Sequence, residues 1–390
     1  MTNKIPHVAI LIETSKAFGR NLLRGVARYL SHCGPWVTWI EERSLDDPLP
    51  RWLQRWKGDG ILARTRTHKT LKRILDLGIP MVNLGEEPLE GVPIVDIDSA
   101  KIGRLAAEHL LERGFRHFGY VGIRGVCWSD RRKDAFVQRV EAAGATCSVC
   151  EPTSRLRLHS DWETERQKLA DWLQSLPRPV GIMACYDVMG CRLLGVCREL
   201  GLAVPEEVAV IGVDNDQVLC EVAAPPLSSI DQGEERAGYE GAALLDWIIR
   251  GQSSQKTVIL DPKGVVTRQS TDVAAVEDPD LQAALCMIRM HACKGLRVED
   301  IADALAISRR TLERRFQKLL GYSPYEQILH IRLERVKHLL AETDWPLRRI
   351  AAETAFENEA YLVVLFKKKY GVTPGEYRSQ YQHASRGFPF

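Results

Sequence analysis

Polar side chains follow several apolar segments of this 390-residue chain at the point where each segment ends. The residues in these positions are carboxylates and amides, namely Glu13, Asn83, Asp98, Asp187, Asp214 and Asn215. Such groups accept paired hydrogen bonds from hydroxyls, and an aromatic ring packs against the C–H side of a sugar. Phe18, Trp36 and Trp128 are the aromatic candidates. The pattern predicts a site for a neutral sugar; the alternative is that each acidic residue only caps the next helix.

A second group of chemically active side chains lies on a basic amphipathic segment. Its apolar stripe, with the i, i+4, i+7 spacing of a helix, is formed by Leu312, Phe316 and Leu319. Its other face carries Arg309, Arg310, Glu313, Arg314, Gln317 and Lys318. Residues 298–305 predict a helix before it, residues 306–307 a turn, and Ser308 a cap of the second helix. A helix that shows arginines on its free face fits a DNA major groove; the alternative is an ordinary solvated helix.

The same helix-turn-helix pattern recurs about 49 residues downstream. Residues 348–354 predict a short helix, residues 355–356 a turn, and residues 359–370 a second recognition helix ended by Gly371. Its inner side is predicted to hold Leu362, Phe366 and Lys369, and its outer side Ala360, Val363, Val364, Lys367 and Lys368. The units span residues 298–319 and 346–369, and two such units on one spacer helix fit two successive major-groove segments.

The first 270 residues alternate between strand and helix. The predicted strands are residues 8–12, 37–40, 60–63, 80–83, 92–97, 118–122, 146–150, 181–185 and 208–213. The predicted helices are residues 20–30, 70–77, 100–113, 131–143, 162–176, 188–200 and 234–250. Apolar strands that alternate with helices indicate parallel sheets covered on both faces. Two such halves predict two α/β lobes, with a ligand cleft beyond the carboxyl ends of the strands.

The net charge of +2 hides an asymmetry along the chain. Residues 281–390 contain 18 Lys and Arg against 12 Asp and Glu, whereas the preceding 280 residues contain 35 against 39. This asymmetry indicates that the tail alone meets a polyanion. The first apolar run is too short for a signal peptide, and no run approaches the roughly 20 residues of a membrane span. We therefore expect a cytoplasmic protein without a membrane partner.

Ten cysteines are scattered through the chain. Cys147 and Cys150 form one C-x-x-C motif, but no second pair accompanies it to complete four zinc ligands. We expect reduced, largely buried thiols and neither a metal ion nor a cofactor.

Residues 7–271 resemble the LacI-type sugar-binding domain. The blocks that carry the resemblance are, in order, GDGILA, IPMVNLG, VDIDSAKIGRLAAEHLLERGFRHFGYVG, PVGIMACYDVMG, GLAVPEEVAVIGVDN, APPLSSIDQ and GVVTRQST. The resemblance implies a two-lobed, type I periplasmic-binding-protein-like fold that closes on an effector. It also implies that Arg132, Asp187 and Asp214 hold the effector, although Ala135 stands where the arginine motif has glycine.

Residues 281–379 resemble the AraC/XylS-type DNA-binding domain. The resemblance rests on the two helix-turn-helix units at this spacing and on FKKKYGVTPGEYR after the second unit. It implies that Arg310, Glu313 and Arg314 face the bases, and arginine to guanine is the commonest base contact. The predicted domains are residues 1–270 for the effector and residues 281–390 for DNA, with residues 271–280 as a linker.

The second unit departs from the AraC/XylS pattern at its outer positions. Val363 and Val364 replace the polar residues common there, and Ala355 stands where glycine is usual in the turn. Valines meet thymine methyl groups but do not read a guanine. We therefore expect the first unit to carry most of the sequence readout, with Lys367 and Lys368 contacting phosphates.

The combination of these two domains resembles that of bacterial regulators of xylose operons. They imply D-xylose as effector, operator half-sites in double-stranded DNA, a homodimer, and RNA polymerase as a partner of an activator. Another monosaccharide and a repressor role remain alternatives. Two alternatives are more distant, a solute-binding protein and a doubly wound α/β enzyme. A solute-binding protein would not explain the basic tail. The sequence shows neither a G-x-G-x-x-G nor a phosphate-binding loop nor a G-x-S-x-G motif for such an enzyme.

Overall fold

The computed structural model describes residues 5–85, 89–154, 162–252, 257–272 and 278–379. The chain divides into two compact units, Met1–Val273 and Ala274–Phe390. Residues 273–277 of the predicted linker lie outside the described residues.

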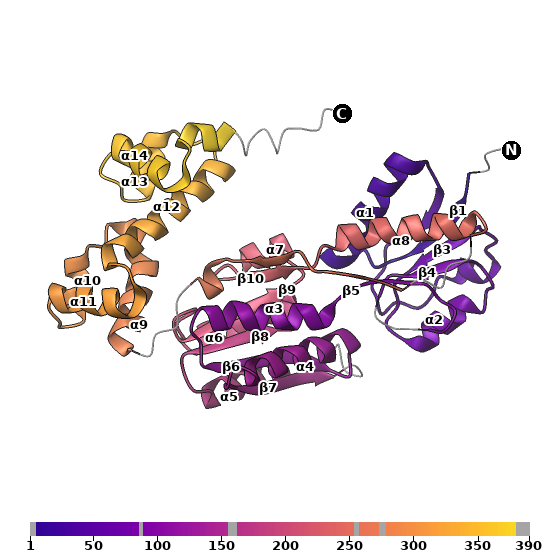
Figure 1. The fold of residues 1–390 in the computed structure, drawn as a ribbon, viewed down its shortest axis with the longest axis horizontal. Coiled ribbons are helices and arrows are strands. Elements are labelled where there is room, and N and C mark those ends of the chain that lie inside the picture. Colours follow the sequence, from indigo (N-terminus) through magenta and orange to yellow (C-terminus); the bar gives the residue numbers. More distant parts are fainter. Residues whose placement is uncertain (1–4, 86–88, 155–161, 253–256, 273–277, 380–390) are drawn as a thin grey trace. The chain divides into compact units, whose positions relative to one another are not determined.

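Unit 1 contains two six-stranded sheets (Figure 1). The first consists of β1 (His7–Leu11), β2 (Val37–Ile40), β3 (Gly60–Ala63), β4 (Met81–Asn83), β5 (Ile94–Ile97) and β11 (Thr257–Leu260), in the order β11-β5-β4-β3-β1-β2. The second consists of β6 (His117–Arg124), β7 (Thr146–Ser154), β8 (Val180–Ala184), β9 (Val208–Val213), β10 (Ser228–Asp231) and β12 (Gly264–Val266), in the order β12-β10-β9-β8-β6-β7. The strands pair in parallel except β10 with β12, so the carboxyl ends of most strands point the same way within each sheet.

Helices cover both sheets. Those of the first lobe are α1 (Ala17–Cys33), α2 (His68–Leu75) and α8 (Glu234–Ile249), and those of the second are α3 (Ser99–Glu112), α4 (Cys127–Glu141), α5 (Trp162–Ser175), α6 (Asp187–Glu199) and α7 (Gln217–Val222). Helices α1 and α8 lie side by side (Figure 1). They approach so closely that a Cβ on Gly25 would lie 1.9 Å from the Glu235 carbonyl oxygen. Only glycine permits this backbone contact.

The chain passes between the lobes after β5, after β10 and after β11. Strands β10, β11 and β12 and helix α7 were not predicted from the sequence. Strand β10 escapes the apolar-run criterion because Ser228 and Ser229, both fully buried, replace aliphatic residues. Their hydroxyls donate to the Arg268 carbonyl at 2.8 Å and to Asp187 at 2.6 Å, which removes the cost of burying them.

Unit 2 is helical. Its elements are α9 (Pro279–His291), the 3₁₀ turn η4 (Ala292–Lys294), α10 (Val298–Ala304), α11 (Arg309–Leu320), α12 (Pro324–Glu342), α13 (Leu347–Glu353) and α14 (Glu359–Tyr370). Ser308 caps α11, as predicted, and Asn358 caps α14 in the same way. The turn residues Ala306 and Ala355 have φ angles of 53° and 54°, so both turns place an alanine in the left-handed region.

Each recognition helix buries two of the three residues predicted for its inner side. Leu312 and Phe316 of α11 and Leu362 and Phe366 of α14 are fully buried. Leu319, predicted in the stripe of α11, is instead 50% exposed. Lys369, predicted on the inner side of α14, is also exposed. Its ammonium group contacts the ring of His330 of α12 at the surface.

Candidate functional site

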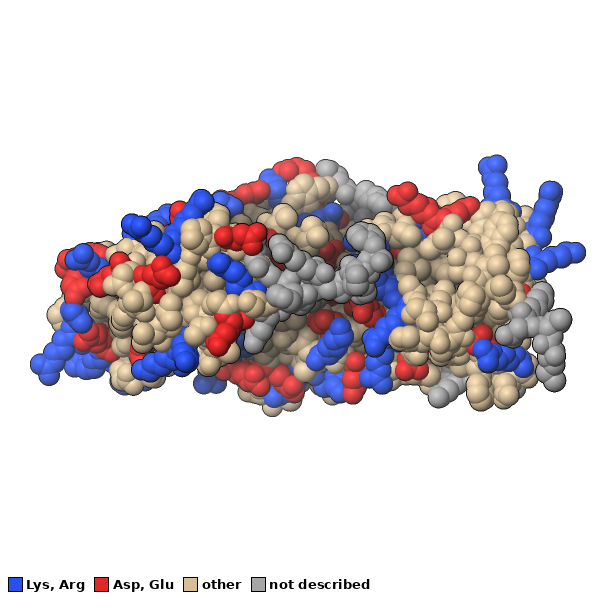
Figure 2. Space-filling model, turned by 90° about the horizontal axis from the view of Figure 1, so that it is seen from above, with Lys and Arg blue, Asp and Glu red and all other residues tan. Residues whose placement is uncertain are grey.

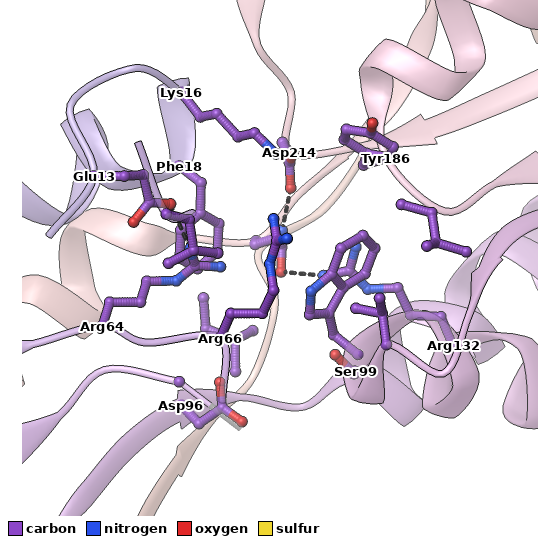
Figure 3. A pocket seen from close by; sticks show the side chains of 17 residues that line it. Glu13, Lys16, Phe18, Arg64, Arg66, Asp96, Ser99, Arg132, Tyr186 and Asp214 are labelled. Atoms are coloured by element: carbon purple, nitrogen blue, oxygen red, sulfur yellow. Dashed lines mark hydrogen bonds and ion pairs between the residues drawn. The ribbon is translucent and has the colours of Figure 1, made fainter. Parts of the chain in front are cut away.

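A pocket opens between the two lobes of unit 1 (Figure 3). Its charged and aromatic lining residues from the first lobe are Glu13, Lys16, Phe18, Arg64, Arg66 and Asp96. Those that follow the strands of the second lobe are Trp128, Arg132, Tyr186, Asp214 and Gln232. Most of them lie just beyond the carboxyl end of a strand, which is the position predicted for ligand-binding residues of parallel sheets.

Five residues proposed from the sequence meet in this pocket. They are Glu13, Phe18, Trp128, Arg132 and Asp214. Figure 3 shows Glu13 and Arg64 on one side and Arg132 on the other, with Asp214 between the two lobes.

The second-lobe side of the pocket is built on a relay of hydrogen bonds. Arg132 donates to the Cys185 carbonyl at 2.6 Å and to the Gln232 side-chain oxygen at 2.9 Å. The Gln232 amide nitrogen donates in turn to Asp214 at 2.5 Å. The Arg132 guanidinium also lies 4.9 Å from the centre of the Trp128 ring. The relay therefore holds a carboxylate, a cation and an aromatic face in fixed relation to one another.

Asp214 combines backbone strain with an altered acidity. Its φ angle is 106°, and that of Asn215 is 48°, so two successive residues adopt backbone conformations that favour glycine. Strain of this kind is typical of ligand sites, because the surrounding structure must enforce it. Burial raises the pKa of the Asp214 carboxyl, while the charges of Arg132 and Lys16 oppose that rise.

The first-lobe side is organised by arginines that already have acidic partners. Arg64 forms an ion pair with the buried Glu13 and lies 4.2 Å from the centre of the Phe18 ring. Arg66 forms an ion pair with Asp46. The charges of these two arginines are therefore already balanced by carboxylates of the same lobe.

Aromatic and cationic side chains also face each other across the pocket. The Lys16 ammonium lies 5.3 Å from the centre of the Tyr186 ring, and burial lowers its pKa. Tyr186 packs edge-on against Trp128, with ring centroids 5.8 Å apart. These contacts make an aromatic wall against which the C–H face of a sugar can pack.

Three residues proposed for the effector do not line the pocket. Asp187 is fully buried beneath it and accepts hydrogen bonds from the Ser229 hydroxyl at 2.6 Å and from the Asp216 N–H at 2.8 Å. Burial and the neighbouring Asp214 raise its pKa well above that of an ordinary aspartate. The strand before it, β8, ends at Ala184, one residue earlier than predicted. Tyr186 lines the pocket, and Asp187 begins α6.

The other two stabilise loops around the pocket. Asn83 is buried and donates to the carbonyl of Gly85, which does line the pocket, at 3.1 Å. Asn215 accepts from Arg268 at 2.8 Å, and its N–H donates to the Ser229 hydroxyl at 2.9 Å. Among the remaining candidates, Asp98 caps α3, and Trp36 packs against Tyr29 outside the pocket. The capping alternative thus applies to Asp98.

The sequence reading missed Lys16, Arg64, Arg66, Tyr186 and Gln232. Arg64 directly follows β3, so the rule that selected Glu13 would have selected it had basic residues been considered. Gln232 follows β10, and it was missed because that strand was missed.

The C-x-x-C cysteines lie on β7 and are free thiols. Burial raises the pKa of Cys147 to about 12 and that of Cys150 to about 11, so both favour the unreactive thiol form. Within the described ranges, no three His, Cys, Asp or Glu side chains converge where a metal ion would bind. No described helix combines the length and apolarity that crossing a bilayer requires.

The second candidate site is the outer face of α11 in unit 2. Arg310, Arg314, Gln317 and Lys318 are exposed, as predicted for a recognition helix. In the part of the chain that the structure describes, Arg310 and Arg314 form neither a hydrogen bond nor an ion pair. They remain available for an external partner.

Two other arginines of α11 are held by acidic residues. Arg309 forms ion pairs with Glu299 of α10 and, at 2.8 Å, with Glu313, which is half-buried. Arg315 forms an ion pair with Asp280 at 2.5 Å and so ties α11 to the start of α9. The helix therefore divides its arginines between internal contacts and a free face. On the face of the molecule shown in Figure 2, basic and acidic side chains are interspersed. A polyanion would therefore meet individual basic residues there and not one continuous basic patch.

Helix α14, in the second helix-turn-helix unit, presents a different surface. Ala360, Lys367 and Lys368 are exposed, Val364 is 63% exposed, and Val363 is half-buried. The lysines stand in the last turn, where they also complement the helix dipole. The surface is an apolar strip followed by a basic end.

Comparison with known proteins covers both units. Residues 107–271 match the model of a periplasmic binding protein-like domain, and residues 301–380 match that of a helix-turn-helix domain. The xylose operon regulatory protein of Escherichia coli (strain K12) is 32% identical over 97% of this chain and 98% of its own length. The protein of that name from Haemophilus influenzae is 30% identical over 97% of this chain and 99% of its own.

A solved structure agrees with these matches. It is described as a xylose-binding transcription activator, is 31% identical, covers 97% of this chain and 99% of its own, and superposes with a TM-score of 0.81. The predicted fold class, a two-lobed periplasmic-binding-protein-like domain followed by helix-turn-helix units, is confirmed. This chain therefore belongs to the family of xylose operon regulatory proteins, which are DNA-binding transcription regulators of the AraC type and not enzymes.

Proposed function

We propose that this chain is a transcription activator that binds D-xylose between the lobes of unit 1 and operator DNA through unit 2. The proposal takes the sugar and the activating role from the names of the relatives. The observation that carries it is the Arg132–Gln232–Asp214 relay beside Trp128, because it presents a carboxylate, a cation and an aromatic face to one small pocket.

In this proposal the sugar is held by five of the predicted residues and by residues that the structure adds. Asp214 and Glu13 accept hydroxyl hydrogen bonds, Arg132 donates, and Phe18 and Trp128 pack against the ring. Asp187, Asn83 and Asn215 support the loops behind them. Sugar binding closes the cleft and shifts the equilibrium between two states of the chain, so that the sugar acts through its differential affinity for them.

The DNA-binding roles follow from exposure. Arg310 and Arg314 read bases in the major groove, and Gln317 and Lys318 contact the adjacent backbone. Arg309 and Glu313 position one another instead of reading bases directly, because their charges are already paired. In the second unit Ala360, Val363 and Val364 fit the groove and Lys367 and Lys368 contact phosphates. A homodimer in the cytoplasm spans two operator half-sites and contacts RNA polymerase.

A thermal-shift screen of pentoses and hexoses tests the effector. D-xylose is expected to raise the melting temperature of the wild-type chain more than arabinose, ribose or glucose at equal concentration. Asp214→Ala is expected to abolish the shift while DNA binding without sugar persists. Asp261→Ala, which removes a carboxylate that is 68% exposed outside the pocket lining, is the matched control and keeps the shift. If another sugar stabilises the chain and D-xylose does not, the proposed effector is wrong.

A further inference from the structure

Helix α12 joins the two helix-turn-helix units, and one arginine near its middle contacts both. Arg332 donates from Nε to the Ala292 carbonyl at 2.8 Å and from one terminal nitrogen to the Leu296 carbonyl at 3.1 Å. Both carbonyls belong to the segment just before α10, where the first helix-turn-helix unit begins. The other terminal nitrogen donates to the carbonyl of Ala355, the turn residue of the second unit, at 3.0 Å. All three nitrogens of one guanidinium are thus used to join two separate units.

This arrangement depends on the shape of the guanidinium. Its N–H groups diverge in one plane, so it reaches three carbonyls in different directions, whereas a lysine ammonium is a compact point charge on a flexible stem. Hydrogen bonds from a cation are also stronger than neutral ones. The Ala355 carbonyl is fixed as well, because its residue holds the left-handed turn between α13 and α14.

A second contact joins the units at the surface. The hydroxyl of Tyr325, at the start of α12, lies 2.8 Å from that of Tyr361 on α14. Both tyrosines line a groove that also contains Arg332, Glu299 of the first unit and Glu357 of the second. The hydroxyl pair and the arginine therefore lie along the same groove between the units.

Both helix-turn-helix units also pack on α12 through apolar side chains. The second unit packs Ile350, Leu362 and Phe366 against Leu333 and Val336 of α12. The first helix-turn-helix unit packs on α12 through α11, and α9 and η4, which precede it, pack there as well. A helix of 19 residues spans about 28 Å, whereas successive major grooves on one face of DNA lie about 34 Å apart. The two recognition helices fit both grooves only if each unit is held at a defined angle to α12.

We propose that Arg332, aided by the Tyr325–Tyr361 pair, is a positioning residue that sets the angle between the two helix-turn-helix units and thereby the spacing of the DNA segments that one protomer binds. The proposal rests on the DNA-binding function proposed above. It assigns Arg332 no contact with DNA, because its nitrogens are occupied by carbonyls. Its loss changes which spacing is bound and leaves the reading of either segment intact.

The test uses the full-length chain and the tightest duplex it selects from a random library. From this duplex a series is made with zero, two or five base pairs inserted between the two major-groove segments, plus a duplex in which the second segment is scrambled. Wild type is expected to prefer the original spacing by at least about tenfold, since two rigidly joined modules gain avidity only when both engage. Arg332→Gln is expected to reduce that preference to less than about twofold, with the affinity for the scrambled duplex unchanged.

Three further variants separate positioning from stability. Arg332→Lys keeps the charge and is expected not to restore the preference. Tyr361→Phe, which removes one exposed hydroxyl, is expected to weaken the preference about threefold with an unchanged melting temperature. Arg335→Gln, an exposed arginine on the same helix, is the control and retains it.

The proposal is overturned if Arg332→Gln keeps the spacing preference, or if it loses affinity for every duplex equally, as a folding defect would cause. If Arg332→Gln fails to fold, Tyr361→Phe decides, and an unchanged spacing preference in that variant overturns the proposal. A wild-type chain that binds no duplex selectively overturns the DNA-binding function, and the positioning role with it.

Discussion

The effector pocket and the outer face of α11 use arginines in opposite ways. In the pocket, Arg64, Arg66 and Arg132 each have an acceptor within unit 1. On α11, Arg310 and Arg314 are exposed and form no ion pair with other described residues. Paired charges orient a neutral ligand through hydrogen bonds, whereas unpaired exposed charges attract a polyanion and release its counterions.

The difference shows what burial does to a charge. A charge in the pocket must be satisfied internally, because an unpaired buried ion is strongly destabilising. A charge on the surface of α11 is solvated, so it needs no internal partner. In the proposed function, residues with the same side chain thus serve two kinds of ligand.

Salt is expected to produce the largest difference between the two sites. A chain that neutralises six to ten phosphates loses about 10³–10⁵-fold in DNA affinity between about 50 and 200 mM salt. The dissociation constant for a neutral sugar is expected to change less than about twofold over that range, because a ligand without charge displaces no counterions. Fluorescence anisotropy with labelled duplex and calorimetric titration with D-xylose measure the two. Equal salt dependence would contradict the contrast.

Removing one free arginine is expected to have the next largest effect. Arg314→Ala should weaken binding of the preferred duplex by about 1–3 kcal/mol, roughly 10–100-fold, and relax selectivity at one base pair. Arg309→Ala, whose arginine is paired with Glu299 and Glu313, is the matched comparison and should change affinity by at most about 1 kcal/mol. Competition with single-base variants of the duplex measures both. A larger effect for Arg309 than for Arg314 would reverse the assignment.

The second helix-turn-helix unit is expected to contribute less sequence selectivity than the first. Lys367→Ala should weaken binding to all duplexes alike and lower the salt slope by about one. Val364→Ala should lose no more than about 1 kcal/mol, and only on duplexes with a thymine at the facing position. Replacing that thymine with uracil, which lacks the methyl group, is the control. A uniform loss for Val364→Ala would assign it to general packing instead.

Acidity is expected to affect the pocket and spare α11. Because burial raises the pKa of Asp214, this carboxyl takes up a proton at a higher pH than an ordinary aspartate. Sugar binding needs the ionised acceptor, so the affinity for D-xylose should fall as the pH falls through that pKa, by less than about tenfold per pH unit. Asp214→Asn should bind weakly with no such dependence. A wild-type affinity that stays constant as the pH falls to about 4, the pKa of an ordinary aspartate, would contradict the role of Asp214.

The smallest expected effect is on the turns of unit 2. Ala306 and Ala355 both hold φ angles that glycine adopts without strain. Ala355→Gly is therefore expected to raise the free energy of unfolding by up to about 1 kcal/mol, and Ala306→Gly by a similar amount. Thermal unfolding measures the change, and DNA affinity should stay constant. A loss of stability would show that the turns are not strained.

Much of the fold was predictable because short apolar strands alternate with helices whose apolar residues recur at helical spacing. Strands β2, β3 and β9 and helix α14 match the predicted boundaries residue for residue. Strand β10 was not predictable from periodicity, because its buried serines depend on partners about 40 residues away.

The pocket was predictable in position but only partly in composition. The ends of strands identified Glu13 and Asp214 correctly as lining residues, whereas Asp187 is buried and the preceding Tyr186 lines the pocket instead. Likewise, the six charged positions of α11 gave no indication that Arg309 and Arg315 are held by Glu299 and Asp280, because those partners lie on other helices. Tertiary contacts, which a single sequence does not display, separate the free charges from the structural ones.

The linkage between the two sites is the most direct test of a sugar-switched regulator. The dissociation constant for D-xylose is measured by calorimetry with the chain free and with the chain saturated by its operator duplex. If the pocket and the DNA-binding units are coupled, the two constants differ by at least about fivefold, and D-xylose changes the DNA affinity by the same factor. Identical sugar affinities in the two states would show that unit 1 and unit 2 act independently.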